Sequence, residues 1–280
     1  MIVCQTVEEV RRARSGLKGV VGFVPTMGAL HRGHRSLLEM ARTECDAVAC
    51  SIFVNPTQFG PSEDLTAYPR TLEADLEMCR EVGVDCVWTP TVEDIHLPGC
   101  QTEVIVTGLG SRFEGESRPD HFQGVATVVT KLFGAVCCDR AYFGQKDLQQ
   151  LFLIRQMVRD LLMPIKIVPV ATARDELGLA LSSRNRYLTN EQRERAAGIY
   201  RGLQKVVERH RLGEKTGLRL EEAFRDELDE MRGAEVERFD LLDARLTKKY
   251  SEGESVESGY CCVAVRYAGV RLIDNVELCS

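Results

Sequence analysis

The sequence predicts an α/β fold in which a doubly wound parallel sheet is followed by a smaller C-terminal α+β domain. Strand-like and helix-like segments alternate between residues 19 and 170, which is typical of a parallel sheet with helices on both faces. After residue 188, two helical segments precede three strand-like runs, and this change of order indicates a second domain. We therefore expect residues 1–184 to form the first domain and residues 185–280 the second.

A β-loop-α unit opens the alternation. Residues 19–25 form an apolar, β-branched run that ends at a proline, as expected of a buried parallel strand. Residues 31–41 have helical spacing, with Leu37, Leu38 and Ala41 on one face. The alternation continues with strands expected at 47–54, 85–88, 141–143 and 165–170, and helices expected at 71–82, 120–136 and 148–162.

Two helix starts have the spacing of a capping box, in which side chains at the N-cap and three residues later satisfy backbone N–H groups. They are Asp120 with Gln123 and Thr189 with Gln192. The helix after Thr189 should extend to about residue 211. A charged helix at 220–231 and strands at 239–242, 261–265 and 270–276 should follow. The segment 171–188 is long and irregular for a compact domain, which favours a functional loop.

Composition narrows the range of functions. Hydrophobic residues make up 44% and charged residues 28% of the 280 residues, and no apolar run approaches the roughly 20 residues that cross a bilayer. The net charge of −6 argues against a nucleic-acid partner. The first residues lack the basic and apolar regions of a secretory signal. We therefore expect a cytoplasmic protein that binds neither membrane nor nucleic acid.

The eleven cysteines contain no Cys-x-x-Cys pair, the spacing that would indicate a zinc or redox site. Two adjacent pairs, Cys137-Cys138 and Cys261-Cys262, lie in apolar stretches. We interpret the cysteines as reduced, mostly buried small apolar residues, which agrees with a cytoplasmic location.

Two histidines lie at the start of the helix expected at 31–41. His31 and His34 are three positions apart, so they share a face next to backbone N–H groups that attract anions. Gly33 leaves the backbone open to a phosphate, and the imidazoles could donate hydrogen bonds to charge that develops on a phosphoryl group. A capping or surface position and a metal site are the alternatives, although no third metal ligand is evident.

Five motifs carry a resemblance to one family. They occur in the order Pro25-Thr26-Met27-Gly28-Ala29-Leu30-His31-x-Gly33-His34, Ser51-Ile52-Phe53-Val54-Asn55-Pro56-Thr57-Gln58-Phe59, Ser117-Arg118-Pro119-x-His121-Phe122, Phe143-Gly144-x-Lys146-Asp147-x-Gln149-Gln150 and Ser182-Ser183-Arg184-Asn185. From about residue 25 to 190, the chain thus resembles the pantothenate synthetase family, within the wider HxGH nucleotidyltransferase superfamily. The resemblance implies that the first domain is Rossmann-like.

The resemblance implies an ATP-dependent ligase that condenses pantoate with β-alanine through a pantoyl-adenylate and releases AMP and pyrophosphate. In the first step a carboxylate oxygen attacks the α-phosphorus, so the charge on the phosphates must be neutralised. The resemblance also implies a homodimer. Mg²⁺ is expected with ATP because it neutralises and orients the triphosphate, and the position of the C-terminal domain after Arg184 suggests that this domain acts as a lid. For the amide-forming step, the hypothesised proton acceptor is His34 or a bound phosphate oxygen.

The resemblance assigns residues to each part of the site. The predicted catalytic residues are His31, His34, Lys146, Ser182, Ser183 and Arg184. The ATP site adds Pro25, Thr26, Met27, Gly28, Gly144, Asp147, Val170 and Leu181. Pantoate is expected at Met27, Asn55, Gln58 and Gln150. Lysine offers phosphate a movable point charge, whereas the planar fork of arginine can hold two oxygens at once.

Two charged residues complete the set. Arg118 is expected to contact an anion, and a solvated loop arginine is the alternative. Asp75 matches an acidic position near Mg²⁺ in the family, but Ala74 stands where a second acid often precedes it.

The sequence departs from the family pattern at two further positions. Leu181 replaces a methionine, which conserves side-chain volume. Leu177 replaces an aspartate before Gly178, which puts the geometry of that loop in question.

Two other functions remain open. One is another HxGH enzyme that transfers a nucleotidyl group to a phosphorylated acceptor, which would require a second basic pocket and would give no amide. The other is a nucleotide sensor that keeps the fold without turnover. Product analysis separates the first from the ligase, and ATP turnover separates the second.

Overall fold

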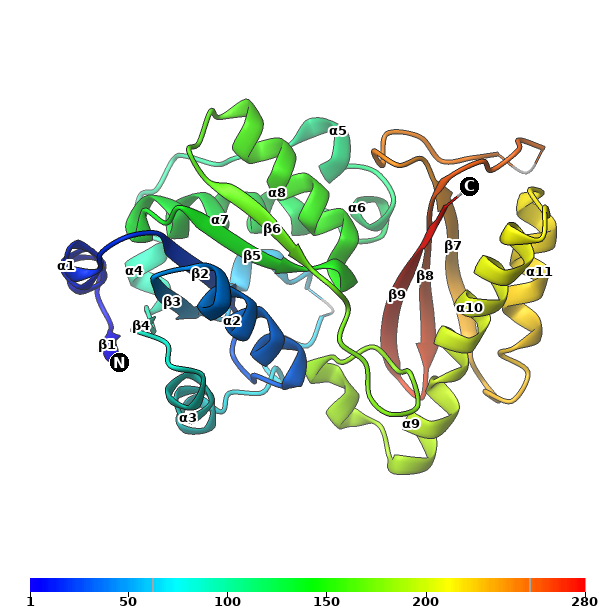
Figure 1. Cartoon of the computed structure of the whole chain (residues 1–280), viewed down its shortest axis with the longest axis horizontal. Coiled ribbons are helices and arrows are strands. Elements are labelled where there is room, and N and C mark those ends of the chain that lie inside the picture. The colour runs from blue at the N-terminus through cyan, green and yellow to red at the C-terminus, as the bar shows by residue number, and fades with distance from the viewer. Residues whose placement is uncertain (62, 252, 280) are drawn as a thin grey trace. The chain divides into compact units, whose positions relative to one another are not determined.

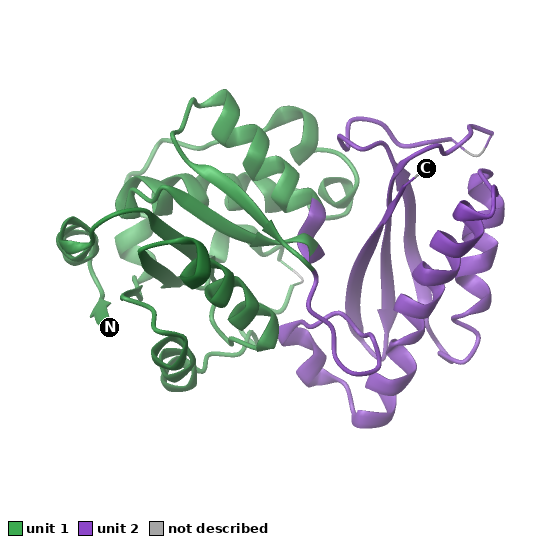
Figure 2. Ribbon diagram, in the orientation of Figure 1, with its two compact units in different colours: residues 1–145, 149–171 green, residues 146–148, 172–280 purple. Residues whose placement is uncertain are grey.

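The computed structural model describes residues 1–61, 63–251 and 253–279 and divides into two compact units, coloured separately in Figure 2. Unit 1 comprises residues 1–145 and 149–171, and unit 2 comprises residues 146–148 and 172–280. The expected domain boundary, after residue 184, lies further along the chain than this division. Residues 172–184 belong to unit 2, because Arg174 forms a bidentate ion pair with Asp274 and a backbone bridge with Ala180.

Unit 1 contains a six-stranded parallel sheet in the order β1-β4-β3-β2-β5-β6 (Figure 1). Its strands are β1 (Ile2–Cys4), β2 (Val21–Thr26), β3 (Ala47–Ile52), β4 (Cys86–Trp88), β5 (Arg140–Gly144) and β6 (Lys166–Val170). From β2 the chain moves outward through β3 and β4, and it then returns to the other side of β2 with β5. The strand order therefore reverses between β2 and β5, and ligands of such folds bind at the carboxyl ends of the strands at this point.

Helices cover both faces of this sheet. The longer ones are α1 (Val7–Gly16), α2 (Arg32–Glu44), α3 (Leu72–Val82), α7 (His121–Val136) and α8 (Leu148–Asp160). The shorter ones are α4 (Val92–Ile95), α5 (Thr107–Gly110), α6 (Glu114–Ser117), η1 (Pro56–Gln58) and η2 (Gln145–Asp147). Along β2, Phe23 packs in a core with α1, α7 and α8, whereas Val24 packs in a second core with α2 and α3. The expected doubly wound α/β fold is confirmed.

Unit 2 contains an antiparallel three-stranded sheet in the order β7-β8-β9. Its strands are β7 (Glu235–Leu242), β8 (Gly259–Tyr267) and β9 (Val270–Leu278), and its helices are η3 (Ser183–Tyr187), α9 (Asn190–Ala196), α10 (Gly198–Arg211) and α11 (Gly217–Asp226). Leu203 of α10 and Phe224 of α11 form one apolar cluster with side chains of β8 and β9, including Val263 and Leu272. The expected smaller α+β domain is also confirmed.

Several local expectations were wrong. The sequence did not predict β1, because its three residues are too few to show an alternating pattern. This strand is held by its pairing with β4. The Asp120 capping box does not form, because Asp120 has a positive φ of 66° and its side chain makes no capping bond. The Thr189 capping box does form, but its helix ends at Ala196, and α10 begins at Gly198. The charged helix begins and ends earlier than expected.

The cysteines fit the sequence interpretation in most positions. All eleven are free thiols, and of these Cys100, Cys137 and Cys279 are exposed. Burial raises the pKa of Cys86 and of Cys138 to about 12, so these thiols stay protonated at neutral pH and behave as small apolar groups.

In the part of the chain that the structure describes, the helices are too short or too polar to traverse a lipid bilayer.

Candidate active site

The predicted site residues divide between the two units. Unit 1 carries the loop after β2, the histidines of α2, the polar residues of η1, and Gln150 of α8. Unit 2 carries Lys146, Asp147 and the serines and arginine of η3.

Hydrogen bonds within unit 1 hold the loop after β2 in one conformation. Thr26 donates its hydroxyl to the carbonyl of Ser51 and accepts the N–H of Gly28. Gly28 has a φ of +79°, and a Cβ there would lie 3.0 Å from both Asp75 Oδ2 and Ile52 Cγ2. Only glycine adopts this conformation without strain, which explains the glycine in the first motif.

Asp75 of α3 holds the same loop from the side. Its Oδ2 accepts the N–H of Ala29 at 2.9 Å, and its Oδ1 accepts the N–H of Leu30 at 2.8 Å and the hydroxyl of Thr71 at 3.0 Å. Asp75 is 2% exposed. The carboxylate thus positions the backbone that leads into α2, while its role near Mg²⁺ stays a prediction.

His31 and His34 form the N-terminal cap of α2. The N–H of Gly33 donates to His31 Nδ1 at 3.1 Å, and the N–H of His31 donates to His34 Nδ1 at 3.3 Å. This is a capping box made of two imidazoles. The capping role was an alternative to the phosphate role, but the two are compatible. Because each Nδ1 accepts a hydrogen bond, a neutral ring must carry its hydrogen on Nε2.

Asn55 and Gln58 lie after β3, which neighbours β2 in the sheet. The Nδ2 of Asn55 donates to Gln58 Oε1 at 3.1 Å and to the carbonyl of Gly124 at 3.3 Å. The Nε2 of Gln58 donates to Met27 Sδ at 2.9 Å. The structure therefore brings together three of the four residues predicted for pantoate.

His96 was not predicted as a site residue, yet it contacts Asn55. Its Nε2 lies 2.9 Å from Asn55 Oδ1, and its ring lies against Phe53 with a centroid distance of 6.2 Å. Burial lowers the pKa of His96, and the nearby Lys131 ammonium lowers it further, so the ring is neutral at pH 7. Because 41 residues separate His96 from Asn55, local sequence spacing gives no signal for this contact.

Arg118 is held by protein groups. Its guanidinium forms a bidentate pair with Glu63, with N···O distances of 2.7 and 2.6 Å. Its third nitrogen lies 3.1 Å from His121 Nε2, and the other ring nitrogen of His121 lies 2.7 Å from the carbonyl of Gln58. These contacts tie Arg118 to the backbone that carries Gln58, and the anion contact expected of Arg118 stays a prediction.

The neighbouring glutamines of α8 have different surroundings. Gln149 is buried; its amide group donates to the carbonyls of Leu109 and Arg112 and accepts the N–H of Glu114. It therefore orders the segment that contains α5 and α6. Gln150 is half-buried, and its role towards pantoate stays a prediction.

Unit 2 places Lys146 and Asp147 next to β9. Asn275 of β9 donates its Nδ2 to the Lys146 carbonyl at 3.0 Å. The ammonium of Lys146 lies 3.9 Å from a carboxylate oxygen of Asp147. The lysine side chain is mostly buried and the aspartate side chain half-exposed.

The two serines and Arg184 lie at the start of η3. Ser182 is the N-cap and accepts the N–H of Arg184 at 3.3 Å, Ser183 is buried, and Arg184 is half-buried. Asn185 donates its Nδ2 to the carbonyl of Ala180, which folds the preceding segment back on η3.

An aspartate holds the loop around Leu177, although Leu177 itself replaces the aspartate of the family pattern. Asp175 Oδ1 accepts the N–H groups of Leu177 and Leu179. The aspartate that holds this turn therefore lies two residues before the position that the family pattern predicts.

The other residues predicted for ATP lie at strand ends or in the same loops. Pro25 precedes the last residue of β2, Gly144 ends β5 and Val170 ends β6. Leu181 is half-buried and precedes Ser182. Three of these positions thus lie at the carboxyl ends of parallel strands, where α/β folds bind ligands.

Metal ligands do not cluster in the described part of the chain. Across residues 1–61, 63–251 and 253–279, no three His, Cys, Asp or Glu side chains are close enough to hold an ion together.

A doubly wound parallel sheet with polar side chains at the carboxyl ends of its central strands defines the class of α/β ligand-binding proteins. A model of the pantoate-beta-alanine ligase family matches residues 2–277. The pantothenate synthetase of Chloroflexus aurantiacus is 48% identical over 277 residues, which cover 98% of this chain and 97% of that protein.

Two solved structures resemble the whole chain. The crystal structure of pantothenate synthetase from Thermus thermophilus is 44% identical, with a TM-score of 0.93 and complete coverage of both chains. Pantoate-beta-alanine ligase from Francisella tularensis, complexed with beta-gamma ATP and beta-alanine, is 34% identical, with a TM-score of 0.82 and coverage of 99% of this chain and 97% of that one. The chain belongs to the pantoate–β-alanine ligase family, and the expected family and enzyme class are confirmed.

Proposed function

We propose that this enzyme condenses pantoate with β-alanine at the expense of ATP, through a pantoyl-adenylate, and releases AMP and pyrophosphate. The observation that carries the proposal is the imidazole capping box at the carboxyl end of β2, in which Nδ1 of each histidine accepts a backbone N–H and the ring hydrogen is thereby placed on Nε2. Donors that are already oriented stabilise charge as it develops on a phosphoryl group. Membership of the ligase family supports the choice of substrates.

Unit 2 carries further residues that are assigned to phosphate binding. Lys146 and Arg184 supply positive charge, and Ser182 and Ser183 supply hydroxyl groups. The guanidinium of Arg184 can hold two phosphate oxygens, whereas the Lys146 ammonium can follow the α-phosphate as its charge changes. Asp147, with its half-exposed side chain, is assigned to a ribose hydroxyl.

Pantoate is assigned to Gln58, Gln150, Asn55 and Met27. Gln58 donates to the thioether of Met27, which is a weak acceptor. A carboxylate or hydroxyl oxygen of pantoate would accept the same N–H more strongly, so this bond can be exchanged at little cost when pantoate binds.

The amide-forming step requires alignment of the amine and exclusion of water, because AMP is a good leaving group. The proton of the amine passes to His34 or to a bound phosphate oxygen. In the first case the accepting atom is Nδ1 of His34, which must first release the His31 N–H, because Nε2 of the neutral ring already carries the hydrogen.

Magnesium enters as MgATP. Mg²⁺ keeps several waters and binds through substrate phosphates with few protein ligands, which agrees with the dispersed acidic residues among the described side chains. Asp75 is the one carboxylate assigned near the ion, and its two oxygens are assigned to the N–H groups of Ala29 and Leu30 rather than to the metal.

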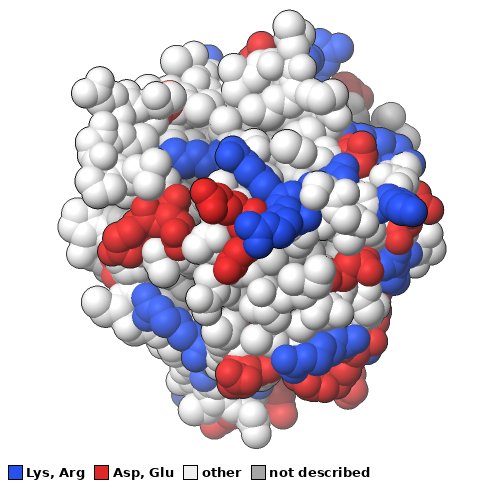
Figure 3. Space-filling model, turned by 90° about the vertical axis from the view of Figure 1, so that its left-hand side faces the viewer, with Lys and Arg blue, Asp and Glu red and all other residues white. Residues whose placement is uncertain are grey.

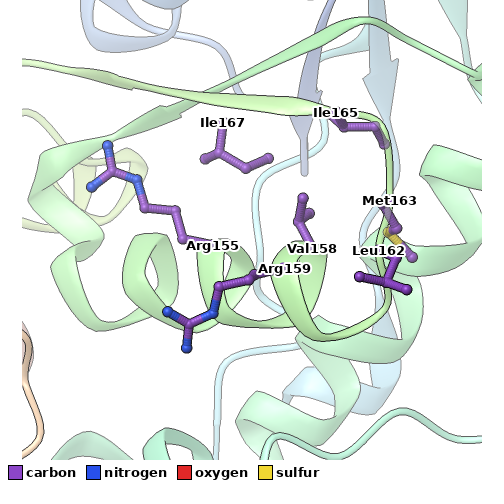
Figure 4. A pocket seen from close by; sticks show the side chains of 7 residues that line it. All are labelled: Arg155, Val158, Arg159, Leu162, Met163, Ile165 and Ile167. Carbon is purple, nitrogen blue, oxygen red and sulfur yellow. The ribbon is translucent and has the colours of Figure 1, made fainter.

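The enzyme is assigned as a homodimer. Exposed apolar side chains at the end of α8 support an interface there, since Leu161 is 49% and Leu162 is 88% exposed. They adjoin a pocket of about 380 Å³ that Figure 4 shows between α8 and β6, lined by Arg155, Val158, Arg159, Leu162, Met163, Ile165 and Ile167. Light scattering of the enzyme and of Leu162→Asp tests this: the variant should be monomeric at a concentration at which the wild type is dimeric.

A cytoplasmic location and the absence of a nucleic-acid partner belong to the same proposal. The net charge is −6, and basic and acidic side chains lie side by side on the face shown in Figure 3. A nucleic-acid surface would need a continuous basic patch.

The test is an assay with MgATP, pantoate and β-alanine that follows AMP, ADP and pyrophosphate and omits each acid in turn. We expect AMP and pyrophosphate, with full turnover only when both acids are present. ADP would refute the adenylate route. Absence of any turnover would favour a nucleotide sensor, and transfer of AMP to a phosphorylated acceptor would favour the other HxGH enzymes.

A further inference from the structure

Gln58 can donate to a substrate only if its amide has one particular orientation. A glutamine amide has an oxygen that accepts and a nitrogen that donates, and a half-turn of the group exchanges the two. In this structure the oxygen faces Asn55 Nδ2 at 3.1 Å and the nitrogen faces Met27 at 2.9 Å. The orientation of Gln58 therefore depends on that of Asn55.

The orientation of Asn55 follows from its own partners. Asn55 is 1% exposed, so water cannot satisfy its amide. The carbonyl of Gly124 can only accept, and it lies 3.3 Å from the Asn55 nitrogen. The oxygen of Asn55 must therefore face the other way, towards the Thr57 hydroxyl at 2.9 Å and His96 Nε2 at 2.9 Å.

His96 must then be the donor in its contact with Asn55. Its neutral ring carries one N–H, and the acceptor opposite Nε2 places that hydrogen on Nε2. The ring is itself held in place. It lies against Phe53, and the preceding carbonyl, that of Ile95, accepts the ammonium of Lys131 at 2.9 Å.

We infer that His96 is a positioning residue for the carboxylic acid substrate: it holds the Asn55 amide so that Gln58 presents its N–H₂ group to pantoate. The inference rests on the proposed function, because it takes pantoate as the ligand of Gln58. Without the His96 donor, Asn55 loses one of the two donors that face its oxygen, and its amide can turn. The Gln58 oxygen would then lose the N–H₂ group of Asn55 as its donor. The Gln58 amide could turn as well, and its oxygen instead of its nitrogen would face the substrate carboxylate.

The test compares two replacements of His96. In His96→Phe an aromatic ring remains against Phe53, but the N–H is lost. In His96→Gln the amide nitrogen can occupy nearly the position of Nε2 and can donate to Asn55. The KM values for pantoate, MgATP and β-alanine and the kcat are measured for the wild type and both variants, and the Tm of each shows whether it is folded.

We expect His96→Phe to raise the KM for pantoate about tenfold, as for the loss of one oriented hydrogen bond. The KM for MgATP should stay within about twofold, and His96→Gln should restore the KM for pantoate to within about threefold of the wild type. Equal increases in all three KM values, or failure of His96→Gln to restore binding, would show that His96 only stabilises the fold and would overturn the inference.

Thr57→Val provides a second route if His96→Phe does not fold, because Thr57 is the other donor to Asn55 Oδ1. It should raise the KM for pantoate selectively as well, and an unchanged KM would count against the inference.

Failure of the proposed function would give a different result, because the wild type itself would then not turn over pantoate. A wild type that turns over pantoate, with variants that do not change its KM selectively, refutes the inference alone.

Discussion

The imidazole rings of His31 and His34 lie with their centroids 4.1 Å apart at an interplanar angle of 41°, and each accepts a backbone N–H through Nδ1. The same pair thus caps α2 and orients its own Nε2 atoms. The structural task is the cap, the chemical task is the proposed donation to phosphate, and substitution can separate the two.

Replacement of His31 by asparagine should retain the cap and remove the donor proposed for catalysis. Asparagine is among the best N-cap residues, but its amide nitrogen lies closer to the backbone than the imidazole Nε2 does. We expect an almost unchanged free energy of unfolding and a loss of adenylation of about a hundredfold. His31→Ala should in addition destabilise the protein by about 1 kcal/mol. Urea unfolding and pyrophosphate release measure the two effects, and equal stabilities of the two variants would contradict the capping role.

Replacement of Asp75 by asparagine tests whether the carboxylate holds the loop or binds the ion. Asparagine keeps one oxygen but sets an N–H₂ group against a backbone N–H, either that of Ala29 or that of Leu30. We expect a loss of about 1–3 kcal/mol of stability and a lower kcat, with an unchanged dependence of rate on Mg²⁺ concentration. A variant of normal stability that needs much more Mg²⁺ would instead identify Asp75 as a metal ligand.

Replacement of Gly124 in α7 tests how closely this helix packs against the backbone of Thr57 and Gln58. A Cβ at Gly124 would lie 2.4 Å from the carbonyl oxygen of Thr57 and 2.9 Å from the nitrogen of Gln58. Gly124→Ala should therefore displace η1, destabilise the protein by about 1–3 kcal/mol and raise the KM for pantoate. Gly134 lies on the same helix, and a Cβ there would meet no described atom within 4 Å, so Gly134→Ala is the matched control and should stabilise by about 0.5–1 kcal/mol. Thermal unfolding compares the two, and similar Tm changes would refute the packing argument.

Lys146 is predicted to support adenylation by charge. Its replacement by alanine should reduce the rate of pyrophosphate release at least about a hundredfold, the effect of losing one oriented charge-stabilising group. Lys166 is an exposed lysine of β6, and Lys166→Ala should leave that rate unchanged. Normal adenylation in Lys146→Ala would remove this lysine from the site.

Cys100 should be the most reactive of the exposed cysteines. A hydrogen bond with the backbone of Thr102 lowers its pKa, and the Lys131 ammonium, whose Nζ lies 3.5 Å from Sγ, lowers it further. A lower pKa gives more thiolate at a given pH near neutrality, and the thiolate is the species that reacts. We expect iodoacetamide to label Cys100 before Cys137 and Cys279 at about pH 7.5, as seen by peptide mass spectrometry. In Lys131→Met this preference should be reduced, and an unchanged preference would contradict the role of Lys131.

The sequence predicted the elements whose signals are local. The run at residues 19–25 and the helical spacing of Leu37, Leu38 and Ala41 correspond to β2 and α2, with all three side chains buried. The Thr189 capping box formed because both partners lie within four residues. The Asp120 capping box had the same spacing, but a positive φ at Asp120 turned the side chain away from the helix N–H groups. Spacing alone cannot predict that backbone conformation.

The chain by itself determined the α/β class, the α+β second part, and the pair of histidines after the first long strand, because periodicity and capping act over a few residues. Only the tertiary structure decided which groups orient the site. Asp75 reaches a loop 45 residues earlier, and His96 reaches Asn55 across 41 residues. Such contacts depend on how helices pack against the sheet and where neighbouring strands end. A buried amide takes its orientation from every partner around it, and those partners become neighbours only when the chain has folded.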